Sequence, residues 1–205
     1  MVEKHRAGRP VMTQVDLLRA VNIAPRFELA TFENYQPKTV AAKHNFGICQ
    51  NYANSWEKRK KAGEGLVLCG RPGTGKTHLA VAICRVVATE KQACAFMTTA
   101  SRIIRAFRRS WNHESEQTEF ETLRFYSELD LLVIDEIGVQ YGTDSERNIL
   151  FEVMNNRYED LLPTILISNL SLSELSDLLG ERVIDRMSHG GVVLAFDWSS
   201  YRRTE

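Results

Sequence analysis

Short apolar runs alternate with longer amphipathic segments along most of this chain. Five runs have the length and composition of buried strands, and they lie at 66–69, 93–98, 131–134, 164–168 and 191–196. Between them, apolar residues recur at helical spacing over about 79–87, 101–111, 118–129, 149–161, 171–179 and 181–187. This β-α-β-α-β order predicts an α/β fold, with a parallel five-stranded sheet flanked by helices.

The first 30 residues lack this regular pattern. They are basic at the start and carry one apolar cluster at helical spacing, formed by Val15, Leu17, Leu18 and Val21. We predict a loosely held amino-terminal arm over 1–30, whose short helix could bind a partner. One domain over 31–205 follows and opens with a helix near 39–62. A chain of 205 residues that is 43% hydrophobic can bury one full core.

A glycine-rich segment directly after the first predicted strand matches the phosphate-binding pattern G-x4-G-K-[ST]. Glycines let backbone N–H groups approach phosphates, the lysine neutralises their charge, and the threonine hydroxyl is suited to Mg²⁺. The bland alternative is a glycine turn with a solvated lysine, but a strand before and a helix after favour nucleotide binding. The predicted cofactor-binding residues are Gly70, Arg71, Pro72, Gly73, Thr74, Gly75, Lys76, Thr77 and His78.

Two adjacent acids end the third predicted strand, at Asp135 and Glu136. One carboxylate can hold a metal ion while the other orients and activates water, so this pair favours hydrolysis over binding alone. We predict that Asp135 and Thr77 hold Mg²⁺ and that Lys76, Asp135 and Glu136 are catalytic. The alternative is that two acids simply end a buried strand and begin a turn.

The overall composition limits which ligands and which cellular location we expect for the protein. The formal net charge is zero, so nucleic acid would have to bind a local basic patch. The four cysteines do not have the spacing of metal ligands, so we predict that they are buried thiols. Because no run approaches the roughly 18 apolar residues of a membrane span, we expect a cytoplasmic protein with no membrane contact.

Together these motifs, in this order, resemble the AAA+ ATPases and, more closely, the DnaC-type helicase loaders. The likeness lies in four segments, 70–76, 130–138, 179–187 and 196–202, of which the last two are the most specific. DnaI-type loaders and IstB-type transposition helpers share the first two. The resemblance implies a P-loop AAA+ core, ATP as the nucleotide and Mg²⁺ as its metal. Only about 36 residues follow Asn169, so we expect no full helical lid domain.

The resemblance also implies roles for polar residues beyond the phosphate loop. Asn169 corresponds to the residue that contacts the γ-phosphate or its attacking water, although an asparagine there could merely cap a turn. Arg182 and Arg186 lie four apart on one predicted helix, so both could point outward together. Arg186 is expected to act on a neighbouring subunit's ATP, with Arg182 as a supporting or alternative contact. The alternative is that the two arginines simply pair with acids on a solvated helix. Arg202 is a weaker candidate for nucleotide contact.

A basic helix near 101–111 is the candidate DNA-binding element. It carries arginines with interleaved aromatic residues and no acid, which suits single-stranded DNA. In loaders of this type, the helical insert at this place lines the path of the single strand. The alternative is that the aromatics are a buried stripe and the arginines a solvated face. The candidate residues are Arg102, Arg105, Phe107, Arg108, Arg109 and Trp111.

The resemblance therefore implies an ATPase that binds a hexameric replicative DNA helicase and single-stranded DNA. A trans arginine implies self-association, and hydrolysis should be slow until subunits assemble. The arm is shorter than the amino-terminal region that usually grips the helicase in DnaC-type loaders. Two alternatives therefore stay open: a transposition helper that acts on duplex DNA, and a truncated, non-catalytic decoy that binds a helicase.

Overall fold

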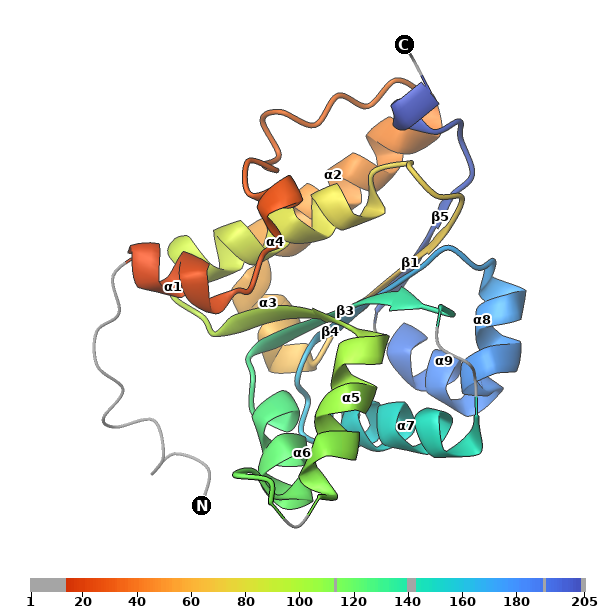
Figure 1. The fold of residues 1–205 in the computed structure, drawn as a ribbon. Helices are drawn as coiled ribbons and strands as arrows, with labels where there is room; N and C mark the ends of the chain where they lie inside the picture. The colour runs from red at the N-terminus through yellow and green to blue at the C-terminus, as the bar shows by residue number, and fades with distance from the viewer. Residues whose placement is uncertain (1–13, 113, 140–142, 190, 204–205) are drawn as a thin grey trace.

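Five parallel strands form the centre of the molecule, in the order β2-β3-β4-β1-β5 (Figure 1). The computed structural model describes residues 14–112, 114–139, 143–189 and 191–203. The strands are β1 (Leu66–Gly70), β2 (Ala95–Thr99), β3 (Leu131–Ile137), β4 (Thr164–Ser168) and β5 (Val192–Phe196). The predicted α/β fold is confirmed. Because β4 lies between β1 and β3, the carboxyl ends of these three strands meet at one edge of the sheet.

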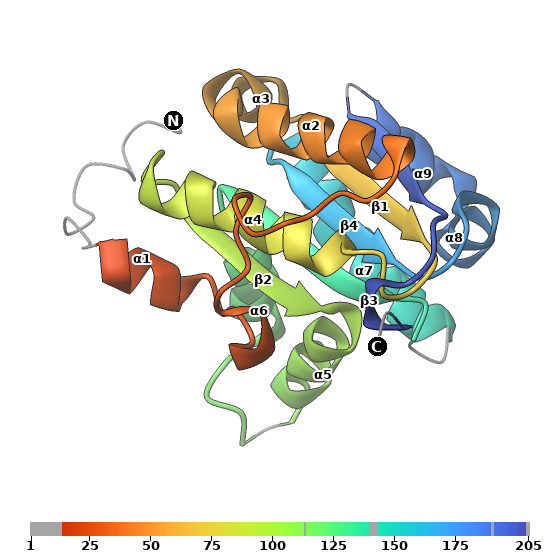
Figure 2. The same ribbon diagram turned by 90° about the horizontal axis from the view of Figure 1, so that it is seen from above.

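Helices cover both faces of the sheet (Figure 2). The sheet divides the hydrophobic core into two clusters, one on each face. One face carries α1 (Gln14–Ala20), α2 (Val40–Asn54), α3 (Trp56–Ala62) and α4 (Lys76–Thr89). The other carries α5 (Ala100–Ser110), α6 (Glu119–Ser127), α7 (Asp144–Glu159), α8 (Leu172–Leu179) and α9 (Glu181–Ser188). Along β1, Leu66 and Leu68 pack toward the first face while Val67 and Cys69 pack toward the second. This burial on both faces explains why the strands are continuous apolar runs.

Capping boxes begin three of the helices on the second face. The side chains of Thr143 and Ser171 accept hydrogen bonds from the backbone N–H groups of Glu146 and Glu174. In turn, the carboxylates of the two glutamates accept from the backbone N–H groups of Thr143 and Ser171, as their spacing predicted. Thr118 does the same at the start of α6. Gly180 ends α8 as predicted, with a φ of 90° that disfavours a side chain.

The described part of the amino-terminal arm is held against the core, so the expectation of a loose arm is wrong for residues 14–30. Val21 is fully buried, and Ala30 belongs to the same core cluster. The backbone N–H of Met97 donates to the Val21 carbonyl (2.8 Å), and the Asn22 side chain donates to the Met97 carbonyl (2.8 Å). These two bonds pair the backbone N–H and carbonyl of Met97 on the outer edge of β2, where an edge strand would otherwise present unpaired groups. The division at residue 30 stays a prediction.

The prediction that the cysteines are buried thiols is confirmed for three of the four. Cys49, Cys69 and Cys84 are buried and Cys94 is half-buried. Within the described ranges, no cluster of acidic, histidine and cysteine side chains forms a preassembled metal site, and no helix is long and apolar enough to cross a membrane.

Candidate nucleotide-binding site

The loop between β1 and α4 has the backbone that the glycine pattern requires. Gly70, Gly73 and Gly75 have positive φ values of 113°, 76° and 96°. A Cβ atom on Gly73 would lie 2.1 Å from the Ser200 hydroxyl oxygen, and one on Gly75 would lie 2.6 Å from the Tyr35 ring. Glycine is therefore needed both for its backbone angles and for the close approach of two side chains from elsewhere in the chain.

Lys76 begins α4 and is almost fully buried. Its ammonium group donates to the backbone carbonyls of Gly70 (2.7 Å) and Arg71 (2.6 Å). Burial lowers the pKa of Lys76 to about 8, and the nearby Asp135 carboxylate partly opposes that shift. The lysine is thus a poorly solvated cation at the mouth of the loop, which favours an approaching anion.

Thr77 and Asp135 lie together at the ends of neighbouring elements. The Thr77 hydroxyl donates to a carboxylate oxygen of Asp135 (2.9 Å). Burial raises the pKa of Asp135, and hydrogen bonds from the Glu136 backbone and Thr77 work against that rise. A hydroxyl and a carboxylate oxygen are hard ligands that fit Mg²⁺ beside nucleotide phosphates. The two residues predicted to hold the metal therefore lie within hydrogen-bond distance of each other, and their role as metal ligands stays a prediction.

Glu136 faces the same cavity as Asp135 because β3 is irregular at this point. The pairing of β3 with β4 shifts register between Ile134 and Ile137, and Glu136 has a left-handed φ of 57°. Its backbone N–H donates to Asp135 (2.7 Å). In a regular strand these neighbours would point to opposite faces, whereas the bulge lets both line the cavity. Such a backbone costs about 1–3 kcal/mol and is typical of functional sites.

Asn169 directly follows β4 and lines the cavity from between the phosphate loop and the acidic strand. The neighbouring Ser168 hydroxyl donates to the Ile137 carbonyl (2.6 Å) and accepts from the Leu170 N–H (3.1 Å). These bonds connect the ends of β3 and β4 and so hold the turn that presents the exposed Asn169 side chain.

The cavity has a volume of about 670 Å³ and extends well beyond the phosphate loop. Its remaining wall comes from both ends of the chain, where Figure 2 shows the segment after β5 beside the loop that precedes α4. The amino-terminal part includes η2 (Pro25–Phe27), and the carboxyl-terminal part includes η3 (Tyr201–Arg203). Sequence reasoning missed the amino-terminal lining, which carries no motif: Arg26, Phe27, Asn34, Tyr35, Gln36 and Lys38.

Most predicted nucleotide-contacting residues line this cavity, but some do not. Pro72, Gly73, Gly75, Lys76, Thr77, His78 and Arg202 line it. Thr74 is fully buried, and Gly70 and Arg71 contribute carbonyls that hold Lys76. His78 lies 2.8 Å from the Thr31 carbonyl through its Nε2 atom. Arg182 lies on α9 and is not among the described residues that line the cavity.

The two arginines of α9 do not point outward together, which corrects the helical-face argument. Arg182 is exposed, whereas the guanidinium of Arg186 lies 5.3 Å from the centre of the Tyr158 ring on α7. One of its nitrogens, Nη1, is buried without a hydrogen-bond partner among the described residues. Arg186 is therefore held against its own subunit by a cation–π contact.

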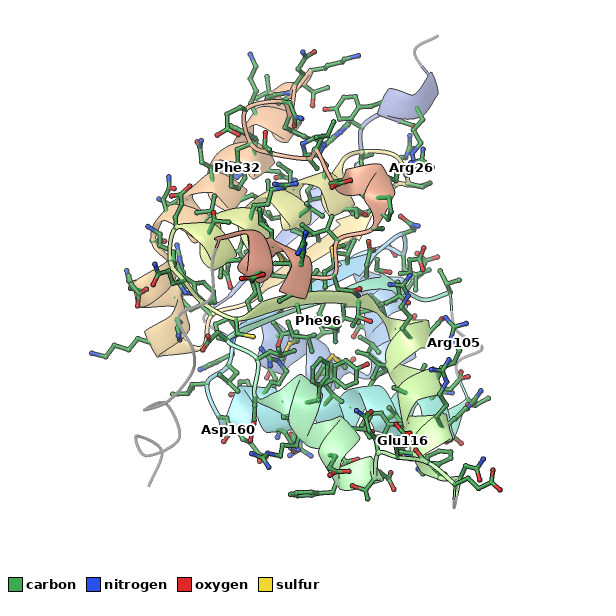
Figure 3. All side chains as sticks on the ribbon, turned by 60° about the vertical axis from the view of Figure 1, so that its left-hand side comes forward. Arg26, Phe32, Phe96, Arg105, Glu116 and Asp160 are labelled. Carbon is green, nitrogen blue, oxygen red and sulfur yellow. The ribbon has the colours of Figure 1, made fainter. Side chains whose placement is uncertain are left out.

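The basic helix α5 has a solvated arginine face, and Figure 3 shows Arg105 projecting from it. Arg102, Arg105 and Arg109 are exposed, while Arg108 pairs with the buried Glu146 (3.0 Å) on α7. Trp111 is 48% exposed. Phe107 is fully buried in the core on the second face of the sheet, so its prediction as a DNA-stacking residue is wrong. It shares the apolar stripe of Ile103 and Ile104.

The fold and the site together define a P-loop nucleotide hydrolase of the AAA+ class. The defining features are the order of the five parallel strands, the phosphate loop after β1, the paired acids near the end of β3 and the polar residue after β4. The profile of the family described as IstB-like ATP binding protein matches residues 1–205. The replicative helicase loader DnaC of Escherichia coli K12 is 33% identical over 181 residues, which are 88% of this chain and 72% of DnaC.

Solved structures agree on the fold. A crystal structure of the DnaC helicase loader matches with a TM-score of 0.76 at 24% identity, covering 85% of this chain and all of the other. A DnaI structure matches with a TM-score of 0.71 at 17% identity, covering 87% of this chain and 94% of the other. The chain belongs to the IstB/DnaC-type family of AAA+ ATPases, and the predicted ATPase class is confirmed.

Proposed function

We propose that this protein is an ATP-dependent helicase loader, which binds the replicative DNA helicase and single-stranded DNA during replication initiation or restart. The observation that carries the proposal is the 33% identity to DnaC across 72% of that loader. The cavity supports it, because the lysine, threonine, acids and asparagine expected to take part in ATP hydrolysis line it together, and a loader that cycles needs a nucleotide it can hydrolyse.

Five residues of the cavity have a proposed task. Lys76 and the loop N–H groups bind the β- and γ-phosphates, and Thr77 and Asp135 hold Mg²⁺, which would neutralise phosphate charge. Glu136 accepts a proton from the attacking water, and its exposure in the cavity next to Asp135 supports this role. Asn169 orients the γ-phosphate or the water from the end of β4.

Hydrolysis is proposed to require a neighbouring subunit that supplies an arginine from α9. Arg186 must leave Tyr158 to do so, and breaking that contact costs about 0.5–2 kcal/mol. Arg182 is exposed and reaches outward without breaking it. The proposal includes both arginines, and single alanine variants separate them. An arginine that acts in trans contributes roughly 10³ to 10⁵ in rate.

Mixed subunits test the trans arginine. Glu136→Gln removes the base but leaves both arginines, whereas the Arg182→Ala/Arg186→Ala variant keeps an intact ATP site. Each should be inactive alone, and a mixture should regain hydrolysis wherever an arginine-bearing subunit adjoins an intact site. A mixture that assembles but stays inactive would contradict the trans role.

Single-stranded DNA is proposed to lie along the exposed face of α5. Arg102, Arg105 and Arg109 supply positive charge, and the half-exposed Trp111 offers a ring for one base. Arg108 is a weaker candidate, because its guanidinium already pairs with Glu146. Stacking on one aromatic ring contributes about 1–3 kcal/mol per base.

Salt-dependent binding to oligothymidine tests this surface. Arg105→Ala/Arg109→Ala should weaken binding and reduce the slope of log affinity against log salt by about 0.7 for each lost phosphate contact. The matched control is Lys58→Ala/Lys61→Ala, which removes two exposed cations from α3 on the opposite face. Equal losses in both double variants would mean that only net charge matters and that α5 is not the binding surface.

A transposition helper is the second candidate, because the matching family profile carries the IstB name. Such a protein should bind duplex DNA in preference to single strands and should ignore the helicase. A non-catalytic decoy should bind helicase and ATP without turnover in any assembly. Comparison of duplex and single-strand affinity at one salt concentration separates the helper from the loader.

Complex formation with the replicative helicase of the same host tests the proposal. Light-scattering chromatography of the mixture with ATP should reveal a stable complex, and ADP or the Lys76→Ala variant should weaken it. Failure to co-elute under every nucleotide condition would exclude direct loading by this chain.

A further inference from the structure

The motif Phe196-Asp-Trp-Ser-Ser-Tyr-Arg202 begins with the last residue of β5, and the segment that follows lies beside the phosphate loop (Figure 2). The N–H of Arg71 donates to the Phe196 carbonyl (2.8 Å), and the N–H of Tyr201 donates to the Gly73 carbonyl (2.9 Å). Ser200 packs so closely on Gly73 that it leaves no room for a Cβ atom. This segment therefore contacts the loop at successive positions.

One carbonyl of the loop receives side-chain donors from both ends of the chain. The indole N–H of Trp198 donates to the Thr74 carbonyl (3.1 Å), and the Tyr35 hydroxyl donates to the same oxygen (3.3 Å). Trp198 is 9% exposed and packs against Phe196, with ring centres 4.9 Å apart. Tyr35 is stacked on Phe46 at 5.7 Å. Both donors are thus fixed by packing on the core.

These bonds determine how the loop presents its N–H groups. A trans peptide is planar, so its carbonyl and the following N–H point in opposite directions. When Trp198 and Tyr35 hold the Thr74 carbonyl, the N–H of Gly75 is directed to the other side of the loop, and Gly75 lines the cavity. Donation to the carbonyl also polarises the peptide and strengthens its N–H as a donor.

We propose that Trp198 and Tyr35 form a clamp that orients the Thr74–Gly75 peptide for phosphate binding, with Trp198 as a positioning residue for nucleotide affinity. The clamp rests on the proposed use of ATP at this site, but it does not depend on helicase or DNA. It gives the carboxyl-terminal motif a role in preparing the loop before nucleotide arrives. It also makes nucleotide affinity depend on two residues that are far from the loop in sequence, Tyr35 and Trp198.

Conservative variants test the clamp in the full chain, with a fluorescent ATP analogue and Mg²⁺ as the probe. Trp198→Phe removes the N–H donor but keeps an aromatic ring, and should weaken binding about fivefold. Tyr35→Phe removes only the longer bond and should have a smaller effect. Because both donors serve one oxygen, the double variant should lose more than the product of the two single losses.

Trp56→Phe is the matched control. Trp56 is fully buried on α3, and its indole N–H has no hydrogen-bond partner among the described residues. The same ring exchange there should leave nucleotide affinity unchanged. The amide resonance of Gly75, observed by NMR without nucleotide, should move in Trp198→Phe and stay in place in Trp56→Phe. In the assembled enzyme, Trp198→Phe should raise KM and leave kcat within about twofold.

Folded Trp198→Phe protein that binds the analogue as tightly as the original chain, with an unmoved Gly75 resonance, would overturn the clamp alone. If Trp198→Phe fails to fold, the Gly75 resonance in Tyr35→Phe decides, because that change removes a single oxygen atom. If the unaltered chain fails to bind the analogue, the proposed ATP-dependent function and the clamp fall together.

Discussion

Nucleotide affinity should depend on pH through Lys76. This lysine is buried, and its pKa is lowered to about 8 because its charged form is poorly solvated. A bound polyphosphate favours the charged form, so the lysine must carry its proton for tight binding. Affinity should therefore be nearly constant below about pH 7 and should fall as the pH rises through 8.

The size of this effect follows from the pKa. A group with a pKa of about 8 is about 91% protonated at pH 7 and about 9% protonated at pH 9, so affinity should drop about tenfold across that interval. The contribution of Lys76 to folding stability changes with pH in the opposite direction. Because the pKa is lower in the folded chain than the usual 10.5, the charged lysine destabilises the fold below pH 8, and this penalty is relieved between 8 and 10.5.

Calorimetric titration of an ATP analogue from pH 7 to pH 9.5, in buffers of different ionisation enthalpy, measures both affinity and proton uptake. Uptake of up to one proton per nucleotide should be detected above pH 8. Lys76→Arg is the control, because its guanidinium stays charged and its weaker binding should be independent of pH. A flat affinity profile for the unaltered chain, with no proton uptake, would refute the reasoning.

Three further outcomes follow from burial and hydrogen bonding. Phe107→Ala should destabilise the fold by about 3–5 kcal/mol in urea denaturation, whereas Trp111→Ala should change stability by less than about 0.5 kcal/mol and weaken oligothymidine binding. Arg157→Leu should cost more than about 3 kcal/mol by the same assay, because its buried guanidinium donates to three backbone carbonyls and one hydroxyl. Thr77→Val should abolish most of the gain in ATP affinity that Mg²⁺ gives, in titrations with and without the metal, since the hydroxyl beside Asp135 is lost.

The parts of the fold that depend on local pattern could be predicted from sequence. Strands buried on both faces are uninterrupted apolar runs, and the capping pairs of α7 and α8 lie three residues apart, so both signals are readable without tertiary knowledge. The phosphate loop was predictable for a similar reason, because its backbone angles demand glycine at fixed positions.

Features that depend on contacts between distant segments could not be predicted. Glu136 reaches the cavity through a bulge in β3, which leaves no mark in the sequence beyond a following glycine. The cation–π contact between Arg186 and Tyr158 joins α9 to α7. The spacing of residues along the sequence does not show how these two helices lie relative to each other. Phe107 could have been placed correctly, since it lies four residues after the buried Ile103, but arginines on either side favoured an exposed reading.

Helicase loading onto closed circular single-stranded DNA tests the central claim most directly. A ring helicase can thread onto a free end of a linear strand, whereas a closed circle requires the ring to be opened. With this chain and ATP, the helicase of the same host should become stably bound to circles, and Lys76→Ala should abolish that transfer while threading onto linear strands continues. Equal amounts of helicase on the circles with and without this chain would contradict the loader account.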